Sequence, residues 1–439
     1  MPACAGRGFG IYQLSMPRFN IRFLIGVGLI IFGIIGTAAI IIFIGWRFRL
    51  FNVPGVKPPE GGVGALPLTG EGGGGQVREP VEGGLPIEGG GEPAGGATGA
   101  GYQPVVDEVA RGRETRVEAV VEGYPMNIDV SPSGGLSYYN PTDTKFYRVN
   151  ADGSGKRLLA NESFPGVSEV VWAPQGDSAI LEYEDGSNVY YDFTTKKTAV
   201  LPKDLAAPSF RSDGGAISYK LDTGNARDNW IVVSNVDGTG AQAVQATGDR
   251  GALVDPQWSP DYKVVATYHK PTGIDREEVF FIGMQGENFK SLEVQGSGFS
   301  GIWSPDGRRV LYSTTLAGAG YQPMLWVADV GGDRTGARQY ALGLSTWVDR
   351  CAFGEDSVTV YCAVPDELPS GAGLVPETAR GIAYTVWSTD LSNGINRRLA
   401  VPVEEGVQTI KDVRKVYLTP DNSSLFLETF EKVYRVKLK

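Results

Sequence analysis

Histidine and cysteine are scarce in this chain. Its 439 residues include one histidine, His269, and three cysteines. A zinc site needs several histidine or cysteine ligands at close spacing. A Ser-His-Asp triad would have to combine His269 with a serine on a strained Gly-x-Ser-x-Gly turn, a motif that the sequence lacks. We therefore expect no metal, no cofactor and no catalytic residue, and the sequence indicates a protein that is not an enzyme.

An excess of basic residues is also lacking. Residues 1–60 hold six of the 40 lysines and arginines and one of the 50 acidic residues, so the rest of the chain carries 34 basic against 49 acidic side chains, a net charge of −15. Binding to nucleic acid depends on neutralising phosphates with basic side chains. The charge balance thus excludes nucleic acid as a partner, and it disfavours a domain that lies flat on anionic lipid.

Charged residues are absent from Phe23 to Trp46, a run of 24 residues. About 20 apolar residues suffice to span a bilayer as a helix. We expect a transmembrane helix over 23–46 that acts as an uncleaved signal anchor, preceded by a cytoplasmic tail over 1–22. A cleaved signal peptide is the alternative, although the run is longer than a typical signal core and no Ala-x-Ala site follows it. Met16 is an alternative start of the chain.

Residues 47–112 lack the hydrophobic pattern of a folded segment. Between residues 55 and 101, 18 of 47 positions are glycine, interspersed with proline and glutamate. Such a composition cannot bury enough apolar surface to fold. The segment 47–112 is therefore predicted to be a flexible Gly/Pro-rich linker, and a folded domain is predicted over 113–439.

The predicted domain contains a sequence repeat. An apolar or aromatic residue, a Ser-Pro-Asp-Gly-like turn and an alternating apolar strand recur seven times between residues 128 and 428. The copies are IDVSPSGGLSYY (128–139), VVWAPQGDSAILEY (170–183), PSFRSDGGAISYK (208–220), PQWSPDYKVVATY (256–268), GIWSPDGRRVLYS (301–313), CAFGEDSVTVYC (351–362) and VYLTPDNSSLFLE (416–427). A second hairpin, often with Asp-Gly at its turn, follows the copies, so each unit predicts one four-stranded antiparallel blade. Such blades bury their faces only by stacking around an axis, which predicts an all-β, seven-bladed β-propeller with nothing helical over 115–439.

The last unit is one strand short. After KVYRVKL (432–438) the sequence offers no outer strand, while TRVEAVVE (115–122) precedes the first blade without an inner partner. We expect the strand 115–122 to complete the seventh blade and so to close the ring. Closure removes the exposed edges that an open sheet would present.

The repeat resembles that of TolB-type β-propellers, which also occurs in the propeller domains of prolyl oligopeptidases and dipeptidyl peptidase IV. The resemblance is clearest at Phe146–Leu159 and Trp303–Tyr312 and extends over about residues 115–439. It implies the propeller but not the catalytic residues of those peptidases, which lie in a separate hydrolase domain. Similarity to TolB, a soluble periplasmic protein with a further domain, implies a role in assembly of the cell envelope, although this fold serves many functions.

Two of the cysteines, Cys351 and Cys362, flank one repeat hairpin. The register that pairs Gly354 with Thr359 across the turn sets the two cysteines opposite each other, where Cα atoms lie about 4.5 Å apart, within disulfide range. We predict a disulfide, with two free buried thiols as the alternative. A disulfide forms in an oxidising compartment. Because the basic residues on the two sides of the span nearly balance, this bond decides the orientation: a single-pass cell-membrane protein with its C-terminal domain extracytoplasmic.

Long insertions gather on one face of the predicted propeller. The loops between second and third strands and the crossovers between blades emerge on the same side, and the insertions there are 220–229, 269–277, 315–323 and 364–381. Long loops on a rigid scaffold are common binding sites, although such insertions are also tolerated without a function. The candidate contact residues are Arg227, Asp228, His269, Lys270, Arg276 and Tyr321. His269 is expected to be an exposed loop residue.

Together these features predict a membrane-anchored scaffold that binds a protein or glycan of the cell envelope. The alternative is an envelope enzyme, a carboxylate-dependent glycan lyase or hydrolase, or a non-catalytic partner of a peptidase. Facing Asp and Glu residues with perturbed pKa values in the central channel would favour the enzyme. An apolar or aromatic patch on the face with the long loops would favour binding.

Overall fold

The computed structural model describes residues 106–404 and 408–439. The expected tail 1–22, the expected span 23–46 and most of the expected linker 47–112 lie outside these residues. In the described part of the chain, no helix has the length and hydropathy that crossing a membrane would need.

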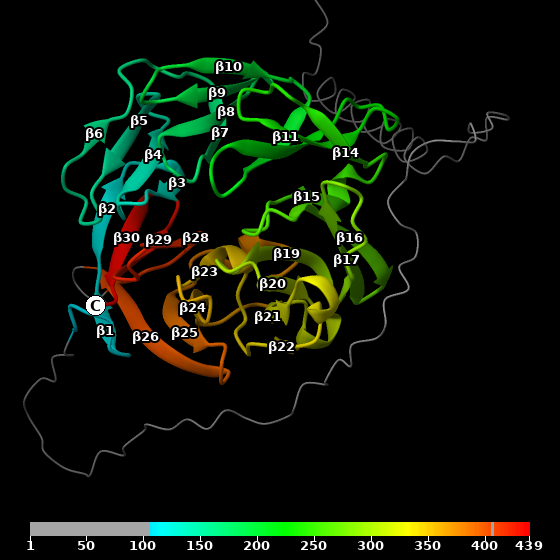
Figure 1. Cartoon of the computed structure of the whole chain (residues 1–439). Helices are drawn as coiled ribbons and strands as arrows, with labels where there is room; N and C mark the ends of the chain where they lie inside the picture. Colours follow the sequence, from blue (N-terminus) through cyan, green and yellow to red (C-terminus); the bar gives the residue numbers. More distant parts are fainter. Residues whose placement is uncertain (1–105, 405–407) are drawn as a thin grey trace, which may run out of the picture. The chain divides into compact units, whose positions relative to one another are not determined.

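Seven antiparallel sheets arranged in a ring confirm the predicted seven-bladed propeller (Figure 1). The strands of blades 1 to 3 are β3 (Met126–Val130), β4 (Leu136–Asn140), β5 (Lys145–Val149) and β6 (Arg157–Leu158); β7 (Val167–Trp172), β8 (Ser178–Tyr183), β9 (Asn188–Asp192) and β10 (Thr198–Leu201); and β11 (Leu205–Phe210), β12 (Ala216–Leu221), β13 (Trp230–Asn235) and β14 (Gln242–Ala246). Those of blades 4 and 5 are β15 (Val254–Pro256), β16 (Val264–Gly273), β17 (Arg276–Gly283) and β18 (Leu292–Gln295); and β19 (Ser297–Trp303), β20 (Arg309–Thr315), β21 (Pro323–Asp329) and β22 (Gln339–Ala341).

The last two blades also use strands from outside the repeat. Blade 6 contains β23 (Cys351–Phe353), β24 (Thr359–Pro365), β25 (Tyr384–Asp390) and β26 (Ile395–Glu404), and β26 pairs further with β1 (Glu114–Arg116) and β27 (Gln408–Thr409). Blade 7 contains β28 (Lys415–Leu418), β29 (Ser424–Glu428), β30 (Lys432–Lys437) and β2 (Glu118–Glu122). Helical structure in the described residues is confined to five 3₁₀ turns, η1 (Gly251–Leu253), η2 (Ala317–Ala319), η3 (Gly332–Arg334), η4 (Val348–Arg350) and η5 (Pro376–Ala379).

The recurring Ser-Pro-Asp-Gly motif forms the turn between the first and second strands of a blade. In blade 5, the Ser304 hydroxyl donates to Asp306 Oδ1 (2.6 Å), and Gly307 supplies the positive φ of +66° that the turn requires. In blade 7, a hydrogen bond from the Thr419 hydroxyl is the largest of the contributions that lower the pKa of Asp421 to about 2. The motif is therefore a turn signal with its own side-chain hydrogen bonds and carries no chemistry.

The core of the propeller consists of seven apolar clusters, one between each pair of neighbouring blades. Between blades 1 and 2, Phe146 is fully buried and its ring centroid lies 5.0 to 5.7 Å from those of Phe164, Trp172 and Phe193. Burying one such side chain stabilises the fold by about 1.5–3 kcal/mol. Because each cluster needs both neighbouring blades, a ring opened at one junction would lack one of the seven clusters.

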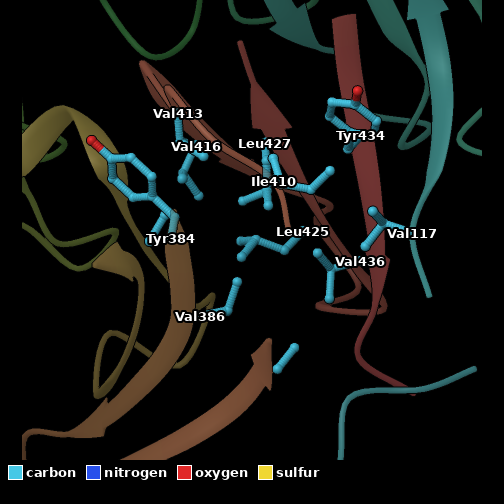
Figure 2. Packing of buried hydrophobic residues seen from close by; sticks show 12 residues of the cluster. Val117, Tyr384, Val386, Ile410, Val413, Val416, Leu425, Leu427, Tyr434 and Val436 are labelled. Carbon is cyan, nitrogen blue, oxygen red and sulfur yellow. The ribbon is translucent and has the colours of Figure 1, made fainter. Parts of the chain in front are cut away.

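The N-terminal segment closes the ring, as predicted, but with two strands instead of one. The strand β2 pairs antiparallel with β30 in blade 7, whereas β1 pairs parallel with β26 in blade 6. Between them lies Val117, whose N–H donates to the Val403 carbonyl (3.0 Å) and whose side chain enters the cluster between blades 6 and 7 (Figure 2). The single strand expected over 115–122 is therefore interrupted by an inward-pointing core residue, and the segment steps from one blade to the next.

Blade 1 packs directly on the closing strand. Gly153, in the turn between β5 and β6, has a φ of +79°, and a Cβ at this position would lie 3.0 Å from the Cα atom and from the carbonyl oxygen of Val120 in β2. In the equivalent turn of blade 3, Gly238 has a φ of +80°, but a Cβ would meet only the side-chain end of Leu201, at 3.1 Å. Glycine at 153 is thus required both by the backbone conformation and by the close approach of β2.

Residues 106–112, which the sequence assigns to the end of the linker, lie against the propeller. The Ala110 N–H donates to the Lys437 carbonyl (2.8 Å), and the Gly112 N–H donates to the Leu399 carbonyl (2.7 Å). These bonds hold the segment on blades 6 and 7 before β1 begins.

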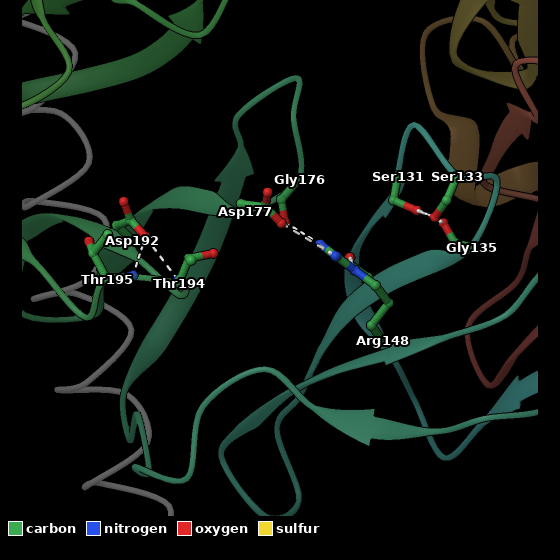
Figure 3. A network of polar contacts seen from close by, with 10 residues as sticks. Ser131, Ser133, Gly135, Arg148, Gly176, Asp177, Asp192, Thr194 and Thr195 are labelled. Carbon is green, nitrogen blue, oxygen red and sulfur yellow. Dashed lines mark hydrogen bonds and ion pairs between the residues drawn. The ribbon is translucent and has the colours of Figure 1, made fainter.

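A partly buried arginine joins blades 1 and 2 near the turns between first and second strands (Figure 3). The Nε atom of Arg148 in β5 donates to the Ser137 hydroxyl (2.9 Å), while its other nitrogens reach the Gly176 carbonyl and Asp177 Oδ1 in the next blade. Hydrogen bonds from a charged donor are stronger than neutral ones. The contact therefore supplements the apolar cluster between these two blades.

The two cysteines of blade 6 face each other across the first and second strands. Cys351 in β23 lies directly opposite Cys362 in β24, with Cα atoms 4.1 Å apart, and their sulfur atoms form a disulfide. Both residues are buried in the cluster between blades 5 and 6. The hairpin register thus brings together the two side chains that the sequence pairs.

Candidate functional site

Loops on one face of the ring form a continuous layer. This face, called the long-loop face below, carries the connections between second and third strands and the crossovers between blades. The loops of blades 5 and 6 are joined by a hydrogen bond from the Gly373 N–H to the Tyr321 carbonyl (2.8 Å). The hairpin of blade 4 joins them through Asp275 Oδ1, which accepts from the Ala317 N–H (3.4 Å).

The layer continues into blade 7 and the first crossover. The Gly381 N–H donates to Asp412 Oδ1 (2.6 Å), which links the long loop of blade 6 to the segment that precedes β28. The Tyr124 N–H, in the crossover from β2 to β3, donates to the carbonyl of Glu431 in the turn between β29 and β30 (3.1 Å). One connected surface therefore runs from blade 4 to the junction of blades 7 and 1.

Exposed apolar side chains gather on this surface. Of the ten large hydrophobic residues that are exposed in the described part of the chain, six lie on the long-loop face. These six, called the apolar band below, are Tyr124, Ile274, Tyr321, Leu374, Val375 and Phe430. The concentration of exposed apolar groups on one face favours a binding role for that face.

A cavity of about 290 Å³ lies beside Phe430 of the apolar band, between blades 6 and 7. Three arginines line this cavity, called the arginine pocket below: Arg350 from η4, Arg380 from the end of the long loop of blade 6, and Arg414 from the segment before β28. The guanidinium carbons of Arg380 and Arg414 lie 5.3 and 4.8 Å from the centre of the Phe430 ring. Cation–π contacts at these distances hold both charges at the mouth of the pocket.

The third arginine is half-buried at the wall of the pocket. The guanidinium of Arg350 stacks on the Trp347 ring at 3.8 Å and lies 5.3 Å from the Tyr384 ring. Its Nε and Nη1 atoms are buried and have no hydrogen-bond acceptor among the described residues. Burial lowers the pKa of Arg350 and raises the pKa of Tyr384 to about 12, so the tyrosine is neutral at neutral pH. An arginine stays charged there in spite of burial.

Two further cavities lie outside the pocket. A cavity of about 520 Å³ adjoins it at Phe430 and is lined by three carboxylates, of which Glu404 already accepts from Lys432 Nζ (2.9 Å) and the Tyr434 hydroxyl (3.0 Å). A cavity of about 470 Å³ lies on the opposite face of the ring, beside Trp303. The first combines the exposed Phe430 with one basic residue, Lys411, against three carboxylates, and the second has no exposed large apolar side chain among the described residues that line it.

The fourth cavity, of about 440 Å³, is formed by the first strands of blades 2 to 5. Aromatic residues such as Trp172 and Phe299 line it, and Asp255 is its carboxylate. Asp255 Oδ2 lies 2.7 Å from His269 Nε2. A single histidine–carboxylate pair therefore stands at this inner cavity, where the catalytic alternative would require facing acids.

Two carboxyl groups elsewhere have raised pKa values. Burial raises the pKa of Asp129 in β3 to about 6, against the opposing charges of Lys415 and Arg148. Burial, with the charge of Glu169 on the paired strand, raises the pKa of Glu182 in β8 to about 7. Neither group lines the inner cavity or the arginine pocket. Among the described residues there is no group of three His, Cys, Asp or Glu side chains that could hold a metal ion.

The chain is similar in part to known proteins. No protein-family model matches it. Over 114 residues it is 29% identical to the Tol-Pal system protein TolB of Anaeromyxobacter dehalogenans, a match that covers 26% of this chain and 24% of that protein. This partial sequence identity and the seven blades agree with the TolB-type repeat motif of the sequence. The propeller is TolB-like. The match spans about a quarter of the relative's length, so it identifies the repeat and not the whole protein.

Solved structures share the architecture of the TolB-like propeller at low sequence identity. They include the oligogalacturonate lyase of Vibrio parahaemolyticus (TM-score 0.45, 10% identity, 74% of this chain and 93% of that one) and the tricorn protease (TM-score 0.49, 9% identity, 73% and 34%). Another is the β-propeller domain of Cps50 (Swd1) from Myceliophteria thermophila (TM-score 0.48, 9% identity, 74% and 100%). At these scores the likeness carries no argument about what the TolB-like propeller binds or does.

The candidate contact residues from the sequence are dispersed over the TolB-like propeller. Arg227 and Asp228 are exposed in the loop between β12 and β13, and Arg276 begins β17 opposite Gly273. Tyr321 is exposed and belongs to the apolar band. None of the six candidates lines any of the four cavities described above.

The segment 269–277, expected to be a loop, is an extended hairpin. His269 and Lys270 belong to β16 and lie opposite Val279 and Glu278 of β17. The side chain of His269 is 12% exposed and contacts Asp255, so the expected exposed loop histidine is wrong. The hairpin extends because β17 also pairs with β18 from its first residue onward, which holds this edge in a strand conformation.

The arginine pocket was missed because its parts are far apart in the sequence. Its arginines come from three separate connections, and none of them stands in a motif. One signal was available: Phe430 occupies the short turn between β29 and β30, where polar or glycine residues are usual. An exposed aromatic residue at such a position indicates a contact surface.

Proposed function

We propose that this chain is a membrane-anchored, extracytoplasmic β-propeller of the cell envelope that binds a protein partner through its long-loop face. The observation that carries the proposal is the apolar band on connected loops, with the arginine pocket beside it. Protein interfaces combine a desolvated apolar centre with anchoring aromatic and arginine side chains. A glycan, the other partner expected from the sequence, would gain little from contact with exposed aliphatic groups such as Leu374 and Val375.

The proposed location has two supports. The disulfide between Cys351 and Cys362 suits an oxidising compartment. The partial relative is named as a component of the Tol-Pal system. Anchoring through residues 23–46 rests on the uncharged run in the sequence.

The proposal is tested by cross-linking in native membranes with a matched pair of variants. Phe430 and Tyr262 are exposed aromatic residues of nearly equal accessibility, 46% and 44%, and each lies beneath an arginine. Phe430 belongs to the apolar band, whereas Tyr262 lies in a tight turn on the opposite face. Phe430→Asn should abolish recovery of a cross-linked partner that the unchanged chain and Tyr262→Asn both retain.

The result can contradict the proposal in two ways. If the unchanged chain recovers no protein reproducibly, the proposed binding function is contradicted. Equal loss with both variants would show that the long-loop face has no special role.

A catalytic function is the second candidate, and the His269–Asp255 pair favours it. A histidine hydrogen-bonded to a carboxylate beside a cavity is the usual arrangement of an acid–base catalyst. Incubation of the full chain with polyuronate and polysaccharide substrates, followed by measurement of new reducing ends, tests this alternative. Turnover that His269→Gln removes would favour the enzyme over the scaffold.

A further inference from the structure

We propose that the arginine pocket binds a carboxylate of the protein partner, supplied by an acidic side chain or by a C-terminus. This inference rests on the proposed function and specifies which chemistry the long-loop face recognises. It assigns Arg350 as the anchoring contact, with Arg380 and Arg414 as the charges at the entrance.

The unused donors of Arg350 are the first reason. A buried N–H without an acceptor destabilises a fold by about 1–3 kcal/mol, and Nε and Nη1 of Arg350 are both in this position among the described residues. These two atoms point away from each other in the guanidinium plane, and each lies beside Nη2. A carboxylate matches Nη2 and one of them with its two oxygens.

The orientation of the guanidinium is the second reason. The plane of Arg350 is held against Trp347 at 3.8 Å, so little rotational freedom remains to be lost when a ligand binds. The side chain lines a cavity of about 290 Å³, which accommodates one acidic group with a few flanking atoms and not an extended polymer. The geometry thus indicates an anchoring pocket for one anionic group.

The charge balance of the pocket is the third reason. Its lining holds three arginines against two carboxylates, Glu377 and Asp412. Asp412 is occupied by the Gly381 N–H at 2.6 Å, and Glu377 is exposed at the rim. Arg414 Nη1 also lies 4.0 Å from Glu428 Oε1, so Arg350 and Arg380 are the two pocket cations that form no ion pair among the described residues. These two charges are available to an anionic ligand on a chain whose net charge is −10.

The surroundings of the pocket favour a protein over a sugar acid or a phosphate. Phe430 of the apolar band lines the pocket, and Leu374 and Val375 of the band directly precede Pro376 of its lining in the chain. An acidic residue flanked by apolar residues in a peptide would satisfy both features at once. A uronate or a free phosphate would use the arginines and leave the aliphatic side chains uncovered.

Synthetic heptapeptide libraries test the inference with the full chain in detergent micelles. The first library has a free C-terminal carboxylate and no Asp or Glu, the second has an amidated C-terminus and contains Asp and Glu, and the third is amidated and lacks both. We expect binding from the first or the second library, which distinguishes a C-terminal from a side-chain carboxylate, and at least tenfold weaker binding from the third.

Arginine variants localise the binding. Arg350→Gln should weaken the binding of the selected peptides at least tenfold. If Arg350→Gln does not fold, Arg380→Gln provides a second variant, because Arg380 is exposed and its replacement cannot disturb the core. Arg211→Gln is the matched control, because Arg211 lies over the Trp258 and Tyr262 rings on the opposite face. This control should leave peptide binding unchanged.

Three results would overturn the inference. They are equal binding of the third library, unchanged peptide binding by both pocket variants, and Arg350-dependent binding of galacturonate or inorganic phosphate with no binding of any peptide. If recovery of the cross-linked partner depends on Phe430 but not on the arginines, this inference is contradicted and the proposed function is not. If the unchanged chain recovers no partner, both the inference and the proposed function are contradicted.

Discussion

Replacing Gly153 with alanine probes the contact between blade 1 and the strand that closes the ring. The new Cβ would lie 3.0 Å from two backbone atoms of Val120, which cannot move without disturbing β2. A left-handed backbone conformation at a non-glycine residue costs about 1–2 kcal/mol, and overpacking adds about 1–3 kcal/mol. We expect Gly153→Ala to lower the free energy of unfolding by about 2–5 kcal/mol.

Gly238→Ala separates these two contributions. Gly238 has almost the same φ, +80° against +79°, but its Cβ would meet only the end of the flexible Leu201 side chain. This variant should therefore lose only the conformational part, about 1–2 kcal/mol. The difference between the two variants measures the contact with β2.

Urea unfolding of the full chain in detergent micelles, followed by tryptophan fluorescence, gives both losses. Hydrogen exchange adds a local measurement, because the amides of β2 and β30 should exchange faster in Gly153→Ala and not in Gly238→Ala. Equal losses for the two variants, or unchanged exchange in β2 and β30, would refute the reasoning that ring closure depends on this approach.

Three further predictions concern stability. Removing the disulfide with Cys351→Ala and Cys362→Ala should lower the free energy of unfolding by about 3 kcal/mol, as expected for a short closed loop; an unfolding midpoint in urea that does not change on reduction of the unchanged chain would count against the bond. The fold raises the pKa of Asp129 to about 6, so the fold is favoured while this group is protonated, and stability is lost as the pH rises through 6. Asp129→Asn should thus stabilise the propeller by on the order of 2 kcal/mol at pH 8 and have little effect at pH 4, as measured by urea unfolding at both pH values. Arg148→Met should lower the free energy of unfolding by about 1.5–3 kcal/mol, because the Gly176 carbonyl loses a charged donor. A midpoint of thermal unfolding equal to that of the unchanged chain would show that the contact between blades 1 and 2 is dispensable.

The repeats made the blades predictable because each blade is encoded locally. Turn motifs and alternating strands lie within about 40 to 65 residues, so the pairing of a strand with its neighbour follows from the sequence itself. The register of one hairpin even places Cys351 opposite Cys362, as the structure has them. The incomplete last unit likewise pointed to closure by the segment near Val117.

Features that depend on neighbouring blades were not predictable. Val117 interrupts the closing strand because a cluster between blades 6 and 7 accepts its side chain, and nothing local marks this. His269 lies in a strand although His-Lys-Pro-Thr-Gly reads as a loop, since pairing with β17 and β18 outweighs that local preference. The arginine pocket likewise exists only where three connections meet.

The closing strand also sets the order in which the protein can be completed. Glu118 of β2 pairs with Arg435 of β30, so about 300 residues must be synthesised before the partner of β2 exists. At roughly 5–20 residues per second this takes about 15–60 s. During that interval the glutamates at both ends of β2, Glu118 and Glu122, discourage pairing with other chains. The first strand of the final blade to be synthesised is thus the last to pair, and a nascent propeller stays open until β30 has left the ribosome.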